Sequence, residues 1–213
     1  MSAEPPLSRG VYGVRCKSSI RSVDVMETQS VKSSPAVHRW TRAQYERMIE
    51  AGVLGEEDRV ELIEGEIVSM SPQGSRHAGT VSLVEEALRT AFPEEVLIRI
   101  QMPLALGSAS EPEPDIAVVE GRPRDFMETH PTTALLVVEV AETSIRFDRT
   151  RKQSLYAQHE IKEYWLVDLG AEHLEVYRHP SESQYEEKTT LHRGETVMPP
   201  EGKKPIAVTD LLP

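Results

Sequence analysis

The chain of 213 residues contains little of what marks a secreted or membrane protein. Its only cysteine, Cys16, has no partner for an internal disulfide, and a cysteine-based metal site is excluded. The first residues lack the apolar core of a secretory signal, and no run of about 18 apolar residues is long enough to span a membrane. These absences predict a cytoplasmic protein in a reducing compartment, without a membrane partner.

Positive charge is also scarce, since 24 Lys and Arg residues are set against 35 Asp and Glu residues and the formal net charge is −11. This balance argues against a protein that coats nucleic acid without specificity, because phosphate contacts need a positive surface. It is compatible with a local basic groove around an acidic metal site, where a bound cation reverses the sign of the charge. The P-loop, GxGxxG and HExxH signatures are absent as well, which removes the common nucleotide-binding and zinc-protease classes.

Regular periodicity begins near Thr41, after a segment with several Ser and Pro and no clear pattern. We expect residues 1–36 to be a flexible extension and residues 37–213 to be one domain. The patterns predict helices at 42–51, 76–92 and 147–159, a hairpin at 60–68, strands at 95–106, 115–119, 134–141, 164–168 and 174–178, and only short strands after these. This order predicts a single α/β domain with a mixed central β-sheet flanked by helices.

One carboxylate interrupts the most apolar strand of the chain. Glu139 lies inside LVVEVA, where a sheet covered on both faces should be dry. A buried, unpaired carboxylate is costly, so Glu139 needs a cation or hydrogen-bond donors. One alternative is that it pairs with a structural Arg or Lys or lies at a sheet edge. The other is that it binds a hard divalent cation together with Asp115, which follows Pro114 at the start of a strand. Such a cation lowers the pKa of a water and offsets charge that develops on a phosphate.

Lys152 shares one face of its predicted helix with Asp148 and Tyr156, because positions four apart stack. One interpretation is a solvated surface pair of Asp148 and Lys152. The other directs Lys152 over the end of the Glu139 strand, where it would hold an attacking water or a phosphate oxygen. The same segment contains further basic residues and predicts a local positive patch suited to a phosphodiester: Arg146, Arg149 and Arg151.

Three further polar residues are candidates with open alternatives. His77 is either a helix-start residue without a special role or a substrate contact. Gln101, in the strand pattern RIQMPL, is a candidate polar neighbour of the site. Glu61 alternates with the apolar residues of RVELIEGEI, which favours a solvated strand face, with a metal ligand as the other alternative.

Several blocks of this sequence, taken in order, resemble the Uma2 family, whose members are classed by inference as restriction endonucleases of the PD-(D/E)XK nuclease superfamily. The blocks extend from about Arg39 to Leu169 and are VELIEGEIVSMSP, His77, QMPLAL, SEPEPDIAVV, LVVEVAETS, DRTRKQSLYA and EYWLVD. Each motif is weak alone, whereas the combination is specific. The resemblance implies a restriction-endonuclease-like fold for residues 37–213, and residues 1–36 have no counterpart.

The resemblance also implies site roles. Pro114–Asp115 corresponds to the PD element and Glu139 to the acid of (D/E)XK. The usual lysine position, two residues after Glu139, is occupied by Ala141 here, which departs from the superfamily pattern; Lys152 on the following helix takes that place.

The leading hypothesis is therefore an endonuclease that hydrolyses DNA phosphodiesters with Mg²⁺ or Mn²⁺. Its expected catalytic residues are Asp115, Glu139 and Lys152, its metal ligands are Asp115, Glu139, the Val140 carbonyl and Glu61, and its substrate contacts are His77, Gln101, Arg149 and Tyr156. Two alternatives stay open: a catalytically inactive module that binds nucleic acid or protein on the same fold, and a nuclease acting on RNA. Many nucleases of this kind cut as twofold dimers, so a homodimer is also expected.

Overall fold

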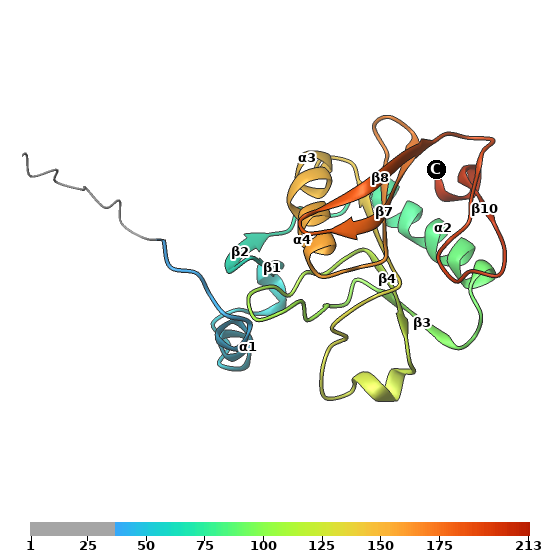
Figure 1. Ribbon diagram of the computed structural model, residues 1–213. Coiled ribbons are helices and arrows are strands. Elements are labelled where there is room, and N and C mark those ends of the chain that lie inside the picture. The colour runs from blue at the N-terminus through green and yellow to red at the C-terminus, as the bar shows by residue number, and fades with distance from the viewer. Residues whose placement is uncertain (1–36) are drawn as a thin grey trace, which may run out of the picture. The chain divides into compact units, whose positions relative to one another are not determined.

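A computed structural model describes residues 37–213, of which His38–Pro213 form one compact unit (Figure 1). The predicted extension at residues 1–36 lies outside the described residues. In the described part of the chain, no helix has the length and apolar character needed to cross a membrane.

The centre of the described unit is a six-stranded mixed sheet with the order β3-β4-β5-β6-β7-β8. β5 and β6 run parallel and are joined by a helical segment, whereas all other neighbours are antiparallel. The strands are β3 (Val96–Ile100), β4 (Ile116–Glu120), β5 (Leu136–Ala141), β6 (Glu163–Asp168), β7 (His173–Ser181) and β8 (Gln184–Leu191). The predicted mixed α/β fold is confirmed.

Helices cover both faces of this sheet. One face packs against α2 (Ser75–Ala91) and the C-terminal elements, which are β9 (Thr196–Val197), β10 (Ile206–Ala207) and η4 (Val208–Leu211). The other face packs against α4 (Gln153–Gln158), which continues the short helix α3 (Ile145–Phe147) and the π-helical segment η3 (Asp148–Lys152).

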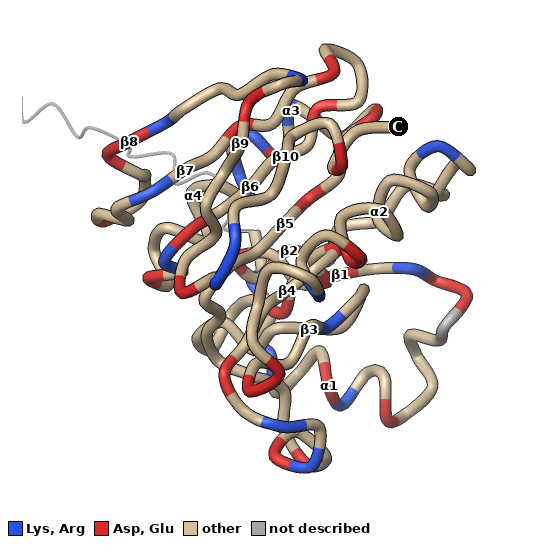
Figure 2. Tube along the Cα trace, turned by 90° about the vertical axis from the view of Figure 1, so that its right-hand side faces the viewer, with Lys and Arg blue, Asp and Glu red and all other residues tan. Residues whose placement is uncertain are grey.

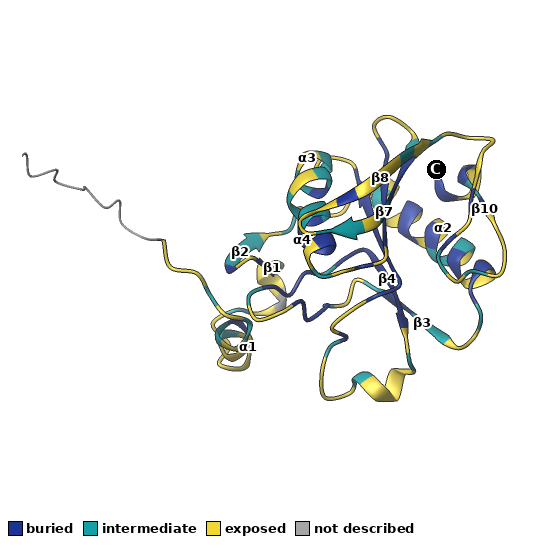
Figure 3. Ribbon diagram, viewed as in Figure 1, coloured by how far each residue is buried: buried dark blue, intermediate teal, exposed yellow. Residues whose placement is uncertain are grey.

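Alternate residues of each strand supply these two cores. In β4, Ile116 and Val118 face the α2 side, while Ala117 and Val119 face the α4 side. All six residues of β5 are buried, as Figure 3 shows for the centre of the sheet. The continuous apolar run LVVEVA is explained by this double cover, and Glu139 shares strand parity with Val137, which packs on the α4 side.

A two-stranded hairpin and a helix lie beside the sheet. α1 (Arg42–Glu50) begins at Thr41, whose side chain accepts a hydrogen bond from the Gln44 amide in a capping box. β1 (Val60–Ile63) and β2 (Glu66–Ser69) are joined by Glu64–Gly65, with φ angles of 50° and 78° as a type I′ hairpin turn requires. The predicted helix and hairpin are both confirmed. Short 3-10 turns complete the fold at η1 (Glu56–Asp58) and η2 (Pro123–Phe126).

Two predicted strands were wrong in extent. The strand expected at 95–106 ends at Ile100, because Gln101 adopts a left-handed φ of 51° and leaves the sheet. The tail contains more than short strands, since β8 extends over eight residues and pairs with β7 at the edge of the sheet. Polar residues dominate β8, and its apolar alternation is therefore weak.

Candidate functional site

A cleft of about 700 Å³ opens where α1, the β1–β2 hairpin, the start of α2 and the ends of β4 and β5 meet. Seven of the nine residues expected at the site line this cleft: Glu61, His77, Gln101, Asp115, Glu139, Val140 and Lys152. The other two, Arg149 and Tyr156, are not part of its lining. The structure thus brings together residues from six separate segments of the chain.

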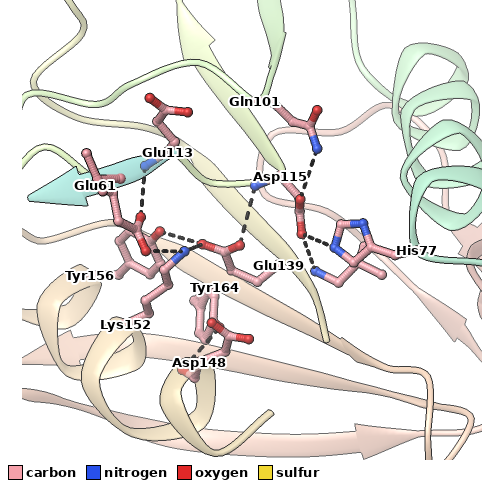
Figure 4. Close-up of polar contacts among 12 residues, drawn as sticks. Glu61, His77, Gln101, Glu113, Asp115, Glu139, Asp148, Lys152, Tyr156 and Tyr164 are labelled. Carbon is pink, nitrogen blue, oxygen red and sulfur yellow. Dashed lines mark hydrogen bonds and ion pairs between the residues drawn. The ribbon is translucent and has the colours of Figure 1, made fainter. Parts of the chain in front are cut away.

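Asp115 is held in place by polar contacts from β5, from α2 and from Gln101 after β3 (Figure 4). Ile116 pairs with Val138 across β4 and β5, so the residue before β4 lies beside Glu139. The Val140 amide donates to Asp115 Oδ2 at 2.8 Å, and His77 Nε2 lies 3.1 Å from the same oxygen. The hydrogen bond with Asp115 raises the pKa of His77. His77, in the first turn of α2, therefore contacts Asp115 and also lines the cleft.

Glu139 accepts two hydrogen bonds from the helix that covers it. Lys152 Nζ donates to Glu139 Oε1 at 3.0 Å, and the Tyr156 hydroxyl donates to the same oxygen at 2.7 Å (Figure 4). Lys152 also forms an ion pair of 3.3 Å with Glu61 Oε1, and the Glu113 amide donates to Glu61 Oε2. A chain of contacts therefore links the hairpin, β5 and the helix through one ammonium group.

The π-helical turn at Asp148–Lys152 places its first and last side chains, both charged, inside the protein. Asp148 and Lys152 are buried, with exposed fractions of 3% and 6%. The interpretation of these residues as a solvated surface pair is therefore wrong. The Tyr164 hydroxyl donates to the Asp148 carbonyl at 3.2 Å and ties this turn to β6. Single π-helical turns are frequent at functional sites, because the extra residue redirects side chains.

Glu61 and Tyr156 lie differently from what their sequence patterns suggested. Glu61 is buried with an exposed fraction of 3%, so the solvated strand face is wrong for this residue. Tyr156 has an exposed fraction of 0%. In this position Tyr156 has no exposed surface for a substrate contact, and its hydroxyl donates to Glu139.

The predicted positive patch on the helix is not formed. Arg149 donates to Asp168 at 3.0 Å and to Glu175 at 2.9 Å on β6 and β7, so its substrate role is not supported by its position. Arg151 instead forms ion pairs with the hairpin turn, at Glu64 and Glu66. Helical spacing directs neighbouring residues to different sides, and nearby acids neutralise these two arginines. Figure 2 accordingly shows Lys and Arg positions interspersed with Asp and Glu along the described chain.

Burial and mutual repulsion set the protonation of the acids. Burial raises the pKa of Glu139 to about 8; Lys152 opposes this shift, whereas Asp115 adds to it. Burial disfavours the charged form of Lys152, but the carboxylates of Glu139 and Glu61 outweigh this effect and raise its pKa well above the ordinary value. Burial also raises the pKa of Asp148. One lysine among several buried acids leaves an excess of negative charge that a cation would offset.

Sequence reasoning missed Glu113 as part of the site. Glu113 lines the cleft, its amide donates to Glu61, and burial followed by repulsion from Glu61 raises its pKa. The available signal was its place in EPEPD, one residue before Pro114–Asp115. An acid in a loop is ordinary, and nothing in the pattern showed that the hairpin packs against this loop.

The arrangement of oxygen donors tests whether the site fits a divalent cation. Among residues 37–213 no group of three or more His, Cys, Asp or Glu side chains is arranged to hold a metal ion. Asp115 Oδ1 and Glu139 Oε2 each have one hydrogen-bond contact within the described residues, at 3.4 Å, to the Gln101 amide group and the Asp115 backbone amide. Mg²⁺ prefers oxygen donors and is usually bound by one or two carboxylates, with water and substrate phosphate completing its shell. The residues present fit such a partly open shell rather than a cage made of protein alone.

Comparisons with known proteins identify the family and the fold. The sequence model of the Uma2 family, described as "Putative restriction endonuclease", matches residues 42–205. A crystal structure of "a putative nuclease belonging to DUF820" from Anabaena variabilis ATCC 29413 has a TM-score of 0.61 and 18% sequence identity, covering 76% of this chain and 94% of that one. At this identity the likeness shows the fold alone. A search of curated proteins finds no match.

Proposed function

Since this chain belongs to the Uma2 family, we propose that it is a nuclease that hydrolyses DNA phosphodiester bonds with Mg²⁺ or Mn²⁺. One observation carries the proposal. Asp115, directly before β4, and Glu139, on β5, each have one oxygen tied to protein donors and one oxygen with a single 3.4 Å contact among residues 37–213. Two such oxygens at the wall of a cleft are suited to a hard cation that also contacts a phosphate.

Asp115 and Glu139 would hold the cation, with the Val140 carbonyl as a third donor and Glu61 as a further one. The bound cation would lower the pKa of a water and offset the charge that develops on the phosphate. Val140 contributes in a second way, because its amide fixes Asp115 Oδ2. The positions of both acids are therefore set before any ligand binds, which is the condition for electrostatic catalysis.

Lys152 has the chemistry to orient a reacting oxygen. Its ammonium group has three donors, of which Glu139 and Glu61 take two. The remaining donor is available to the attacking water or to a phosphate oxygen in the cleft that Lys152 lines. Fixed by two carboxylates, this donor is positioned without the entropy cost of a free lysine side chain.

His77 and Gln101 contribute to the same region. Both contact Asp115 and both line the cleft, so each can position Asp115 and contact a bound phosphodiester. The left-handed φ of 51° at Gln101 is a strained conformation for a residue other than glycine. That strain directs the Gln101 amide group to Asp115 instead of into the continuing strand.

Incubation of the purified protein with Mg²⁺ or Mn²⁺ and supercoiled, linear and single-stranded DNA, and with RNA, tests the proposal. We expect cleavage of DNA that requires the cation and that is lost in Asp115→Asn and Glu139→Gln. Glu120→Gln is the matched control, because Glu120 is an exposed carboxylate at the end of β4 outside the cleft lining. No cleavage of any substrate would contradict the proposal and favour a binding module, while cleavage of RNA alone would identify a ribonuclease.

A further inference from the structure

Six apolar side chains that the proposed chemistry does not use line the cleft. They come from α1, the turn that follows it, the hairpin and α3, and each is at least partly exposed: Ile49, Leu54, Val60, Val68, Met70 and Phe147. Among these residues, Ile49 is a large apolar side chain with an exposed fraction of 46%. Apolar side chains gathered in a concave surface indicate a ligand that presents an apolar face.

This apolar wall lies directly beside the acidic groups. Val68 is the cross-strand partner of Glu61 in the hairpin, so their side chains project on the same face of that hairpin. Glu61 contacts Lys152 at 3.3 Å, and Lys152 contacts Glu139 at 3.0 Å. A nucleotide whose phosphate lies at Glu139 is therefore long enough for its other end to contact Val68.

The charged side chains that line the cleft are mainly acidic, whereas a surface that binds duplex DNA is basic. Six of its lining residues are acidic: Glu61, Glu113, Asp115, Glu139, Glu142 and Asp148. Its Lys and Arg residues are Arg59 and Lys152, and Lys152 is already paired with two carboxylates, as His77 is with Asp115. Proteins that hold a duplex neutralise about 6–10 phosphates with Lys and Arg. Arg149 and Arg151, which could have extended a basic track, are paired with acids elsewhere.

We infer that the cleft takes an unpaired nucleotide of a single DNA strand, with its base against the apolar wall and its phosphodiester at Asp115 and Glu139. This inference rests on the proposed function and specifies its substrate. A volume of about 700 Å³ lies within the range of roughly 300–1,000 Å³ found for small-ligand sites, and it accommodates one nucleotide rather than a helix. Contact of the base with Phe147 and the aliphatic side chains beside it would bury apolar surface, and this supplies binding free energy that an acidic cleft cannot obtain from phosphates.

Fluorescence anisotropy with a short fluorescein-labelled DNA strand, alone and annealed to its complement, measures this preference at one fixed salt concentration. Ca²⁺ replaces Mg²⁺ so that the strand stays intact, which electrophoresis of the recovered DNA verifies. We expect the single strand to bind at least about tenfold more tightly than the duplex, given the few basic residues available for phosphate contacts. Equal or tighter binding of the duplex, or no binding of either form, would overturn the inference.

Substitutions in the apolar wall locate the base. Val68→Ser and Ile49→Ser should each weaken binding of the single strand by about fivefold, the scale of losing one or two buried methyl or methylene groups. Val53→Ser is the matched control, because Val53 has an exposed fraction of 66% on the same turn but does not line the cleft. Ile49 is exposed on α1, so its replacement keeps the test valid if Val68→Ser destabilises the hairpin. Equal binding by all three variants would also overturn the inference.

The binding and cleavage measurements fail independently. Single-strand binding without cleavage in Mg²⁺ or Mn²⁺ would contradict the nuclease proposal and leave the assignment of an unpaired nucleotide intact. Cleavage of duplex DNA at the same rate as single-stranded DNA would contradict the assignment of an unpaired nucleotide and leave the nuclease proposal intact.

Discussion

Lys152 Nζ lies 3.0 Å from Glu139 Oε1, across the boundary between the π-helical turn and the central strand of the sheet. The partners are buried, with exposed fractions of 6% and 4%, and the Tyr156 hydroxyl completes the contact at 2.7 Å. In the general PD-(D/E)XK pattern the lysine follows the acid on the same strand. Here Ala141 takes that position, and the helix supplies the ammonium group from outside the strand.

Replacing Lys152 separates its two effects. Lys152→Met should lower the nuclease rate by roughly 100-fold or more, the scale of losing one positioned electrostatic group. It should also reduce the free energy of unfolding by about 3–5 kcal/mol, because Glu139 and Glu61 are left buried without a counterion. Urea unfolding and single-turnover cleavage, performed on the same preparations, measure both quantities.

A double variant is the control for that experiment. Lys152→Met combined with Glu139→Gln removes both charges of this pair and should recover part of the lost stability, but no activity, because Glu61 still lacks its counterion. Lys152→Arg should rescue only partly, because a planar guanidinium does not replace a compact ammonium group. Wild-type cleavage by Lys152→Met would show that another cation orients the reacting oxygen.

Tyr156→Phe distinguishes a positioning role from substrate contact. The substitution removes only the hydroxyl that donates to Glu139, at a position with an exposed fraction of 0%. We expect kcat to fall by about tenfold with KM unchanged, since an interaction that orients a catalytic group is lost. Stability should fall by about 1 kcal/mol for one hydrogen bond. A rise in KM at constant kcat would instead assign Tyr156 to substrate binding.

The pH dependence of stability follows from the raised pKa values. Burial raises the pKa of Glu139 to about 8, and burial also raises that of Glu111 to about 7. A carboxyl whose pKa is higher in the folded state binds more protons there, so the metal-free protein should lose stability as pH rises from about 5 to 8. The raised pKa of His77 acts in the same direction at the upper end of this range.

Urea titrations in EDTA at several pH values measure this slope. Glu139→Gln should flatten it, because the amide does not titrate, while Glu120→Gln should leave it unchanged. Mg²⁺ should stabilise the protein more strongly at pH 8 than at pH 6, since the cation competes with protons for the same carboxylates. A metal-free protein that gains stability between pH 5 and 8 would contradict the assignment.

The sequence was sufficient for the central features of the site. A glutamate inside LVVEVA cannot be solvated, so it predicted a buried acid with a partner, and the spacing of Asp148, Lys152 and Tyr156 predicted their common face. The contact between Lys152 and Glu139 confirms that the helix lies back over the strand. These inferences depend on local periodicity, which a single sequence contains.

Features that depend on contacts distant in sequence could not be predicted. The alternation of Glu61 indicated an exposed face, but the loop containing Glu113 and the helix containing Lys152 bury it. The sequence indicated that Arg149 is a phosphate ligand, but in the structure Arg149 donates to Glu175 on β7. Both errors have the same cause. The sequence gives the identity of a charged residue, but it does not give the distant residue that neutralises its charge in the fold.

Arg149 anchors the π-helical segment and should affect stability more than substrate binding. Its guanidinium joins Asp168 and Glu175, and Glu175 has an exposed fraction of 3%. Arg149→Met should lower the free energy of unfolding by about 1–3 kcal/mol, as expected for a buried carboxylate that loses one charged partner while Lys188 remains. Arg146→Met is the control, because Arg146 is exposed on the same helical stretch. A large rise in KM with unchanged stability would restore Arg149 as a substrate contact.

The hairpin that holds Glu61 depends on glycine at position 65. Gly65 has a φ of 78°, and a Cβ atom there would lie 2.9 Å from Arg39 Cβ and 3.1 Å from the Trp40 carbonyl oxygen. Gly65→Ala should therefore lower stability by about 1–2 kcal/mol from the left-handed backbone alone, with the close contacts adding to this loss.

Gly79→Ala is the opposite case, because Gly79 lies within α2 with no atom within 4 Å of its added Cβ, and it should raise stability by about 0.5–1 kcal/mol. Thermal unfolding distinguishes the two, with shifts of roughly 2–4 °C per kcal/mol in opposite directions for a chain of this size. If Gly65→Ala also reduces cleavage while Gly79→Ala does not, the register of the hairpin is part of what positions Glu61 beside Lys152. An unchanged melting temperature in Gly65→Ala would show that the turn relaxes and that the hairpin does not depend on this glycine.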